Sequence, residues 1–216
     1  MRVSRGLRAA LLVSTLLASA AAPGSPQAPA TEAFVSGPWL EAQLPPAVVL
    51  LDARPFREFL SGHLPGAQNV SPENLRSTSG GVPAALYPPE ILDAIFARAG
   101  VGAKARVVVY GAGTDVDATY VATAARIAGA AHVHVLDGGF TRWTAEGRPV
   151  TRERALSPAA KPDRRVDARL LVSGAEARKR VGDGKTVFLD VRPAEQWLAG
   201  RIPGAPRESG PPTEDR

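Results

Sequence analysis

The sequence predicts an α/β protein in which a parallel sheet is covered by helices on both faces. Two observations favour this fold. Short apolar runs, typical of strands buried on both sides, alternate with segments of helical spacing, and the connections between them are short. In addition, a twenty-residue pattern that begins with such a strand occurs twice, so one supersecondary unit is used two times.

The first predicted strand is the branched apolar run AVVLLDA at 47–53, which is bounded by Pro46 and Pro55. A helix is predicted around Ile91–Phe96, where apolar residues recur at helical spacing after two prolines, and Gly100 is a natural stop.

Two further strands are predicted at 106–110 (RVVVY) and 132–136 (HVHVL). The segment between them, DATYVATAARIAGA, is rich in alanine and reaches a glycine at Gly129, so it is expected to be a helix. We expect Trp143, in GGFTRW, to pack in the core.

The repeat is the strongest organisational signal. VVLLDARPFREFLSGHLPGA (48–67) returns 138 residues later as TVFLDVRPAEQWLAGRIPGA (186–205), with ten identical positions. Chance similarity between two apolar strands would not also reproduce the Asp, Arg and Pro-Gly-Ala spacings. The first copy is followed by a full set of elements up to Val150, whereas 12 residues follow Gly204, so the second copy is expected to be partial.

The predicted organisation has five parts: a signal peptide at 1–20, a disordered Ala/Pro-rich leader at 21–32, a complete domain at 33–150, a polar linker at 151–167 and a partial second domain at 168–216. If the partial domain forms a strand from TVFLDV, that strand has an unpaired edge and must dock, pair with another chain or stay partly disordered.

The amino terminus has the plan of a secretory signal. Arg2, Arg5 and Arg8 precede a short apolar run, and the small residues Ala18–Ala20 follow it, so cleavage is expected before Ala21. We therefore expect an exported protein, periplasmic or secreted, without a membrane span. An uncleaved amphiphilic tail is the alternative.

Charge does not indicate a nucleic-acid partner. The formal net charge is +5, but removing the three arginines of the predicted signal peptide from 26 Lys and Arg leaves 23 basic against 21 acidic residues. The chain has no cysteine, so it cannot be held by disulfides and must rely on a packed core.

The loop after the 106–110 strand is the candidate binding site, because ligands of α/β proteins sit at the carboxyl end of a strand and the amino end of a helix. It consists of Gly111, Ala112, Gly113, Thr114, Asp115 and Val116. Asp115 and Asp117 lie within one helical turn of each other. Their negative charges offset the attraction of the helix amino terminus for an anion.

Three motifs, in this order along the chain, resemble the rhodanese family, the tandem-domain fold of thiosulfate and mercaptopyruvate sulfurtransferases. LDARPFREF (51–59) is similar to the family's Asp-x-Arg strand end, and FLSGHLPGAQNV (59–70) to its aromatic, His, Pro-Gly-Ala signature. HVHVLDGGFTRWTAEGRPV (132–150) resembles the closing segment. The resemblance implies a rhodanese-like fold for one complete domain and part of a second.

The resemblance also implies a cysteine directly after the strand that reads VVVY here, whose thiolate carries sulfur as a persulfide. That position is Gly111, and Thr114 cannot replace a thiol, so no catalytic residue is predicted. In tandem members the second half commonly carries the cysteine; the repeat offset places it at about 249, beyond Arg216.

Other candidates have plainer interpretations. Asp52 and Arg54, like Asp190 and Arg192, could gather substrate, but we favour hydrogen bonds that fix the following turn together with Glu58. His63 could be a general base, but its copy is Arg201, which favours a structural role.

Two weaker patterns were considered. His132 and His134 share a strand face, but no third ligand is visible, and no metal is predicted. Gly111-x-Gly113, with Asp137 after the next strand, imitates a dinucleotide fingerprint, but Val116 stands where the third glycine belongs. No cofactor is predicted.

Two functions remain open. One is a non-catalytic module of the cell envelope that binds a small sulfur-containing anion or another protein. The other is a sulfurtransferase whose catalytic cysteine lies in a missing carboxyl-terminal half.

Overall fold

The computed structural model describes residues 33–44, 48–79, 82–113, 116–161 and 167–207. The predicted signal peptide and leader lie outside the described residues, as do Thr114 and Asp115 of the candidate loop. Within the described part of the chain, no helix is long and apolar enough to cross a bilayer.

The centre of the molecule is a five-stranded sheet in the order β1-β7-β6-β2-β3, in which every pairing is parallel. The strand bounds are β1 Phe34–Val35, β2 Val49–Asp52, β3 Gln68–Asn69, β6 Arg106–Tyr110 and β7 His132–Leu136. The three strands predicted from apolar runs are therefore confirmed, and β6 and β7 have the predicted bounds. The parallel α/β architecture is confirmed with them.

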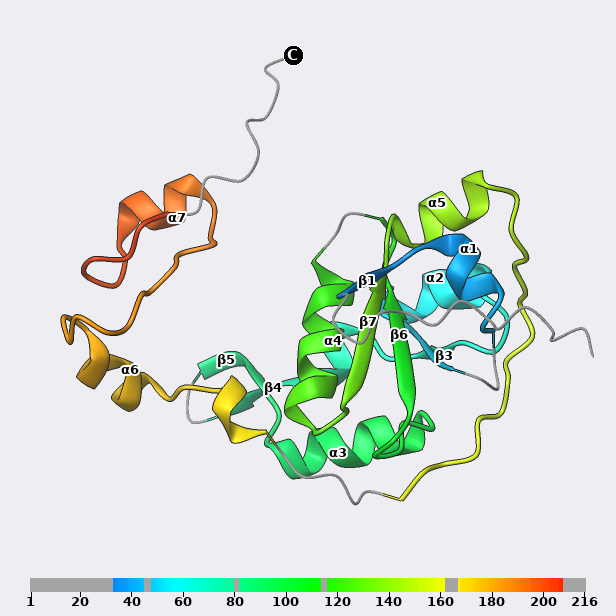
Figure 1. Ribbon diagram of the computed structural model, residues 1–216, viewed down its shortest axis with the longest axis horizontal. Helices are drawn as coiled ribbons and strands as arrows, with labels where there is room; N and C mark the ends of the chain where they lie inside the picture. The colour runs from blue at the N-terminus through cyan, green and yellow to red at the C-terminus, as the bar shows by residue number, and fades with distance from the viewer. Residues whose placement is uncertain (1–32, 45–47, 80–81, 114–115, 162–166, 208–216) are drawn as a thin grey trace, which may run out of the picture.

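Helices cover both faces of this sheet (Figure 1). One layer contains α1 Gly37–Glu41, α2 Phe56–Ser61 and α5 Gly139–Ala145, and the other contains α3 Pro89–Arg98 and α4 Asp117–Ile127. Side chains of β6 alternate between the layers: Val107 and Val109 pack under α3 and α4, whereas Val108 and Tyr110 pack under α1, α2 and α5.

Both core helices agree with the sequence prediction. Helix α3 begins after Pro88 and its chain reverses at Gly100, whose φ of 85° suits glycine. Trp143 of α5 is buried in the core, as predicted, and its indole N–H donates a 2.8 Å bond to the Pro149 carbonyl.

A small antiparallel hairpin between β3 and α3 was not predicted. It follows the 3₁₀ helix η1 Pro72–Leu75 and consists of β4 Arg76–Ser79 and β5 Val82–Leu86. Ser71 begins η1 with a capping box, in which its backbone N–H and hydroxyl both contact the side chain of Asn74.

Residues 151–160, here called the strap, are held against the domain although the sequence placed them in a polar linker. Figure 1 shows the strap running in yellow from α5 past the sheet toward α3. Thr151 forms an antiparallel bridge with His63, and the Ala160 amide donates 2.8 Å to the Ala97 carbonyl. Most of the strap's own contacts come from its backbone carbonyls and amides, which leave no periodic side-chain pattern in a sequence.

The last described part of the chain contains η2 Ala168–Leu170, α6 Gly174–Arg180 and α7 Ala194–Ala199, which lie apart from the sheet in Figure 1. A strand from TVFLDV does not form among the described residues. Val187, Leu189 and Val191 are instead 76%, 61% and 75% exposed. In that part of the structure the stretch has a single parallel bridge, between Asp190 and Arg207, whereas β2 pairs along its length with β6 on one side and with β3 on the other.

Candidate functional site

The loop between β6 and α4 is positioned by its own backbone. The amides of Phe140 and Thr141, at the start of α5, donate to the carbonyls of Gly111 and Ala112 at 2.9 and 2.8 Å. The Thr141 hydroxyl donates a second bond of 2.6 Å to the Ala112 carbonyl. The first residues of the loop are thus anchored to α5, at the carboxyl end of the central strand.

Gly139 allows this close approach. It has a φ of 54°, and a Cβ at this position would lie 2.6 Å from the Gly111 carbonyl oxygen. A side chain here would be strained and would push α5 from the loop.

Gly111, the position where the resemblance places a nucleophile, is buried at the end of β6. Its neighbour Ala112 is exposed, and so is Val116, which immediately precedes α4. Asp117 occupies the first turn of α4 and is already engaged in an interaction. The described part of the loop therefore supplies main-chain atoms and a carboxylate, but no group that can take up sulfur covalently.

Beneath the loop lies a buried ion pair. Asp52 and Arg54 are 0% and 4% exposed. The guanidinium of Arg54 bonds the carboxylate at 2.6 to 3.2 Å, and its terminal nitrogen also donates 2.7 Å to the Gly62 carbonyl. The ring of Phe140 covers the guanidinium at 3.7 Å. A pair enclosed in this way fixes the turn after β2 and is not open to a substrate.

Tyr110 completes the same network, and the sequence analysis had assigned it only to a strand. Its hydroxyl donates a hydrogen bond of 2.6 Å to Asp52 and accepts one of 3.1 Å from the Leu64 amide. Burial raises the pKa of Tyr110, and the neighbouring Asp52 carboxylate raises it further. A tyrosine at the end of an otherwise aliphatic strand was the available signal. Glu58, expected in the network, is exposed, and its backbone amide donates a hydrogen bond to the Pro55 carbonyl.

His63 holds the strap. Its buried ring lies between two backbone carbonyls, with Nδ1 2.8 Å from that of Phe59 and Nε2 3.1 Å from that of Glu153. The ring also stacks on the Phe59 ring at 3.9 Å. Because both nitrogens face protein oxygens, neither is placed to take a proton from a bound substrate, and the geometry favours the structural interpretation.

The histidines of β7 do not form a metal site with the described residues. His132 is exposed and His134 is buried, with its ring 6.1 Å from that of Trp39. In the part of the chain that the structure describes, no three histidine or acidic side chains are grouped to hold a metal ion.

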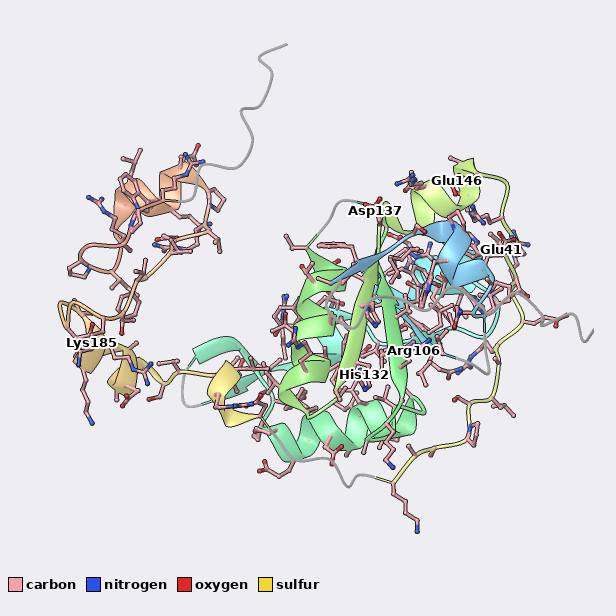
Figure 2. All side chains as sticks on the ribbon, viewed as in Figure 1. Glu41, Arg106, His132, Asp137, Glu146 and Lys185 are labelled. Carbon is pink, nitrogen blue, oxygen red and sulfur yellow. The ribbon has the colours of Figure 1, made fainter. Side chains whose placement is uncertain are left out.

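A chain of surface ion pairs ties α5 to its surroundings. Asp137 pairs with Arg142, which also pairs with Glu146, and Arg148 links Glu146 to Glu41 of α1. Figure 2 labels the three acidic residues of these ion pairs, Asp137, Glu146 and Glu41, around α5 and α1. Exposed pairs contribute little individually, but together they fix the helix whose first amides hold the loop.

The second stretch, residues 186–207, repeats the ion-pair geometry at the surface. The Arg192 terminal nitrogen lies 2.6 Å from Asp190 and 2.7 Å from the Gly200 carbonyl, the same distances as in the buried pair. The Asp190–Arg207 bridge occupies the register of Asp52 and Asn69, 138 residues earlier. The hydrogen bond from Arg192 lowers the pKa of Asp190 to about 2.

Comparison with known proteins assigns the family. Residues 37–146, just over half of the chain, match the model of the rhodanese-like domain. The chain therefore belongs to the rhodanese family, with the parallel sheet and two helical layers described above.

Several of the curated relatives are named as thiosulfate sulfurtransferases. A putative thiosulfate sulfurtransferase of Synechococcus elongatus is 34% identical over 90% of this chain and 64% of its own length. The thiosulfate sulfurtransferase of Gallus gallus is 34% identical over 71% of this chain and 56% of its own. The chain thus spans somewhat less than two thirds of these relatives.

Solved structures agree on the fold. SseA from Escherichia coli, described with the rhodanese fold of 3-mercaptopyruvate sulfotransferases, is 25% identical, with a TM-score of 0.74 over 82% of this chain and 74% of that one. EanB in complex with ergothioneine is 22% identical, with a TM-score of 0.68 over 81% of this chain and 50% of that one. The likeness to EanB concerns the fold alone.

We expect Tyr110→Phe to lower the free energy of unfolding by about 1–3 kcal/mol, because it removes a donor to the buried Asp52 and leaves the Leu64 amide without its acceptor. Urea titration followed by circular dichroism measures the change. Tyr120→Phe is the matched control and should stay within about 0.5 kcal/mol. Equal effects of the two substitutions would show that the buried network does not stabilise the domain.

Proposed function

We propose that the 216-residue chain is a non-catalytic member of the rhodanese family that acts as a binding module for an anion or another protein. One observation carries this proposal: Gly111 stands at the end of β6, where the family resemblance places the sulfur-carrying cysteine, and the sequence contains no cysteine elsewhere. Persulfide chemistry requires a thiolate as nucleophile.

The surroundings of the loop support the same conclusion. The two α5 amides nearest the loop are bound to the carbonyls of Gly111 and Ala112, and Asp117 adds negative charge in the first turn of α4. The Arg54 guanidinium lies under Phe140 and is paired with Asp52. Neither these amides nor this cation is available to stabilise a developing anion.

Purified chain mixed with thiosulfate and cyanide should form thiocyanate at the rate of the buffer alone. The thiosulfate sulfurtransferase of Azotobacter vinelandii, which is 29% identical over 77% of this chain, serves as the active control under the same conditions. Repeated turnover by the purified chain would refute a non-catalytic role.

A second candidate function is sulfur transfer by a longer form of the protein. The match between 48–67 and 186–205, and the repeated geometry of Asp190, Arg192 and Gly200, support a partial second rhodanese domain at 168–216. The greater length of the relatives supports it as well. One of the reading frames of the DNA downstream of codon 205 should then encode a strand followed by cysteine and an LDGG-like segment. Their absence would leave the non-catalytic module.

We further propose that the protein acts in the cell envelope after export. Three arginines followed by an apolar run and small residues support a signal peptide at 1–20. Amino-terminal sequencing of protein recovered from the cell envelope or the medium should begin at Ala21. Recovery of chain that begins at Met1 in the cytoplasm would contradict export.

A further inference from the structure

A groove of about 480 Å³ lies along the outer edge of β3, away from the β6–α4 loop. Its walls come from α2, the end of α3 and the strap, and none of the loop residues that the structure describes, Gly111–Gly113 and Val116, lines it. The volume is within the range of small-molecule sites. The lining residues used below are Phe56, Phe59, Asn69, Ile95, Arg98 and Arg154.

The charges in this lining all have one sign. Arg98 lies in the last turn of α3, and Arg154 belongs to the strap, 56 residues later. Both are exposed, and neither makes a hydrogen bond or ion pair with the described residues. Among the described residues, no acidic side chain lines the groove. Two guanidinium groups with unused donors are suited to a carboxylate or sulfonate.

The groove also offers a flat apolar surface. The ring of Phe56 is 51% exposed and lies nearly parallel to that of Phe59, with an interplanar angle of 18° and centroids 6.2 Å apart. Phe59 in turn stacks on the buried His63, which fixes its plane. Ile95 adds an aliphatic contact. Covering the exposed Phe56 ring with a planar apolar group is favourable.

The walls are formed before any ligand arrives. Gln68 donates 2.8 Å to the Ala155 carbonyl, and Arg152 donates 3.0 Å to the Ser61 carbonyl, so the strap is fixed on both sides of Arg154. Asn69 is held by two bonds from its side-chain amide to the carbonyls of Asp52 and Arg54. A preformed wall reduces the entropy lost on binding.

We propose that this groove binds a small organic anion with a flat apolar body, of the aromatic carboxylate or sulfonate class. The anionic group pairs with Arg98 and Arg154, and the ring lies against Phe56. The site is separate from the β6–α4 loop, so this inference goes beyond the proposed function and does not depend on whether the protein transfers sulfur.

The test uses the full chain and 2-naphthoate as the probe, with binding measured by calorimetry and by amide shifts in NMR spectra. Arg98→Gln and Arg154→Gln should each weaken binding by about tenfold, because each removes a charge-assisted contact. Arg178→Gln, at an exposed position of α6, is the matched control and should bind as the parent does. Phe56→Ala should weaken naphthoate but not acetate.

Several results would overturn the proposal. Undiminished binding after both arginine substitutions would do so, and so would equal affinity for the neutral analogue 2-naphthol. Amide shifts confined to 187–202, where exposed apolar residues gather, would show non-specific hydrophobic binding outside the groove. Inorganic sulfate that binds as tightly as naphthoate would remove the role of the aromatic wall. The arginines are exposed, so their glutamine variants should unfold at the parent's urea midpoint.

Discussion

The buried pair of Asp52 and Arg54 is the constraint on which the rest of the domain depends. An ion pair without water is stable only when its remaining donors and acceptors are occupied. Here Tyr110 from the next strand, the Gly62 carbonyl from the following turn and the ring of Phe140 complete it. One pair thus joins β2, β6, α2 and α5, and it sets where the β6–α4 loop begins.

The second, partly buried copy of this pair shows which contacts need only the nearby sequence and which need the rest of the domain. Asp190 and Arg192 reach the same distances as their counterparts, although half of the Arg192 side chain is accessible. The Asp-x-Arg-Pro sequence therefore forms its turn with local contacts alone. What the second stretch lacks among the described residues is the parallel neighbour that turns an extended segment into a buried strand, as β6 does for β2.

The elements that the sequence predicted well are those with their own periodic signal. β2, β6 and β7 are continuous apolar runs, and α3 and α4 repeat apolar or alanine positions at helical spacing. The hairpin β4–β5 was missed because its first strand, RSTS, is entirely polar and its second, VPAAL, contains a proline. The strap was missed because carbonyl and amide groups hold it, and these are common to every residue.

The candidate site was predicted only in part, for a related reason. The loop follows from the apolar strand that ends before Gly111, and the missing thiol follows from the family resemblance, which implies a cysteine at that position. The groove beside β3 does not, because it brings together side chains from α2, α3 and the strap that are up to 99 residues apart. Tyr110 was likewise placed on the strand, but its contact with Asp52, 58 residues earlier, depends on strand order, which no single segment encodes.

The hydrogen bonds between the β6–α4 loop and the start of α5 have a consequence for the evolution of such a protein. The start of the loop after β6 is held by the carbonyls of Gly111 and Ala112 and by the room left at Gly139, so none of these bonds requires a particular side chain at residue 111. Loss of a nucleophile at that point would leave these bonds in place. Selection for a stable domain alone therefore does not preserve a nucleophile at this position, and a descendant without catalytic activity can keep the ancestral fold.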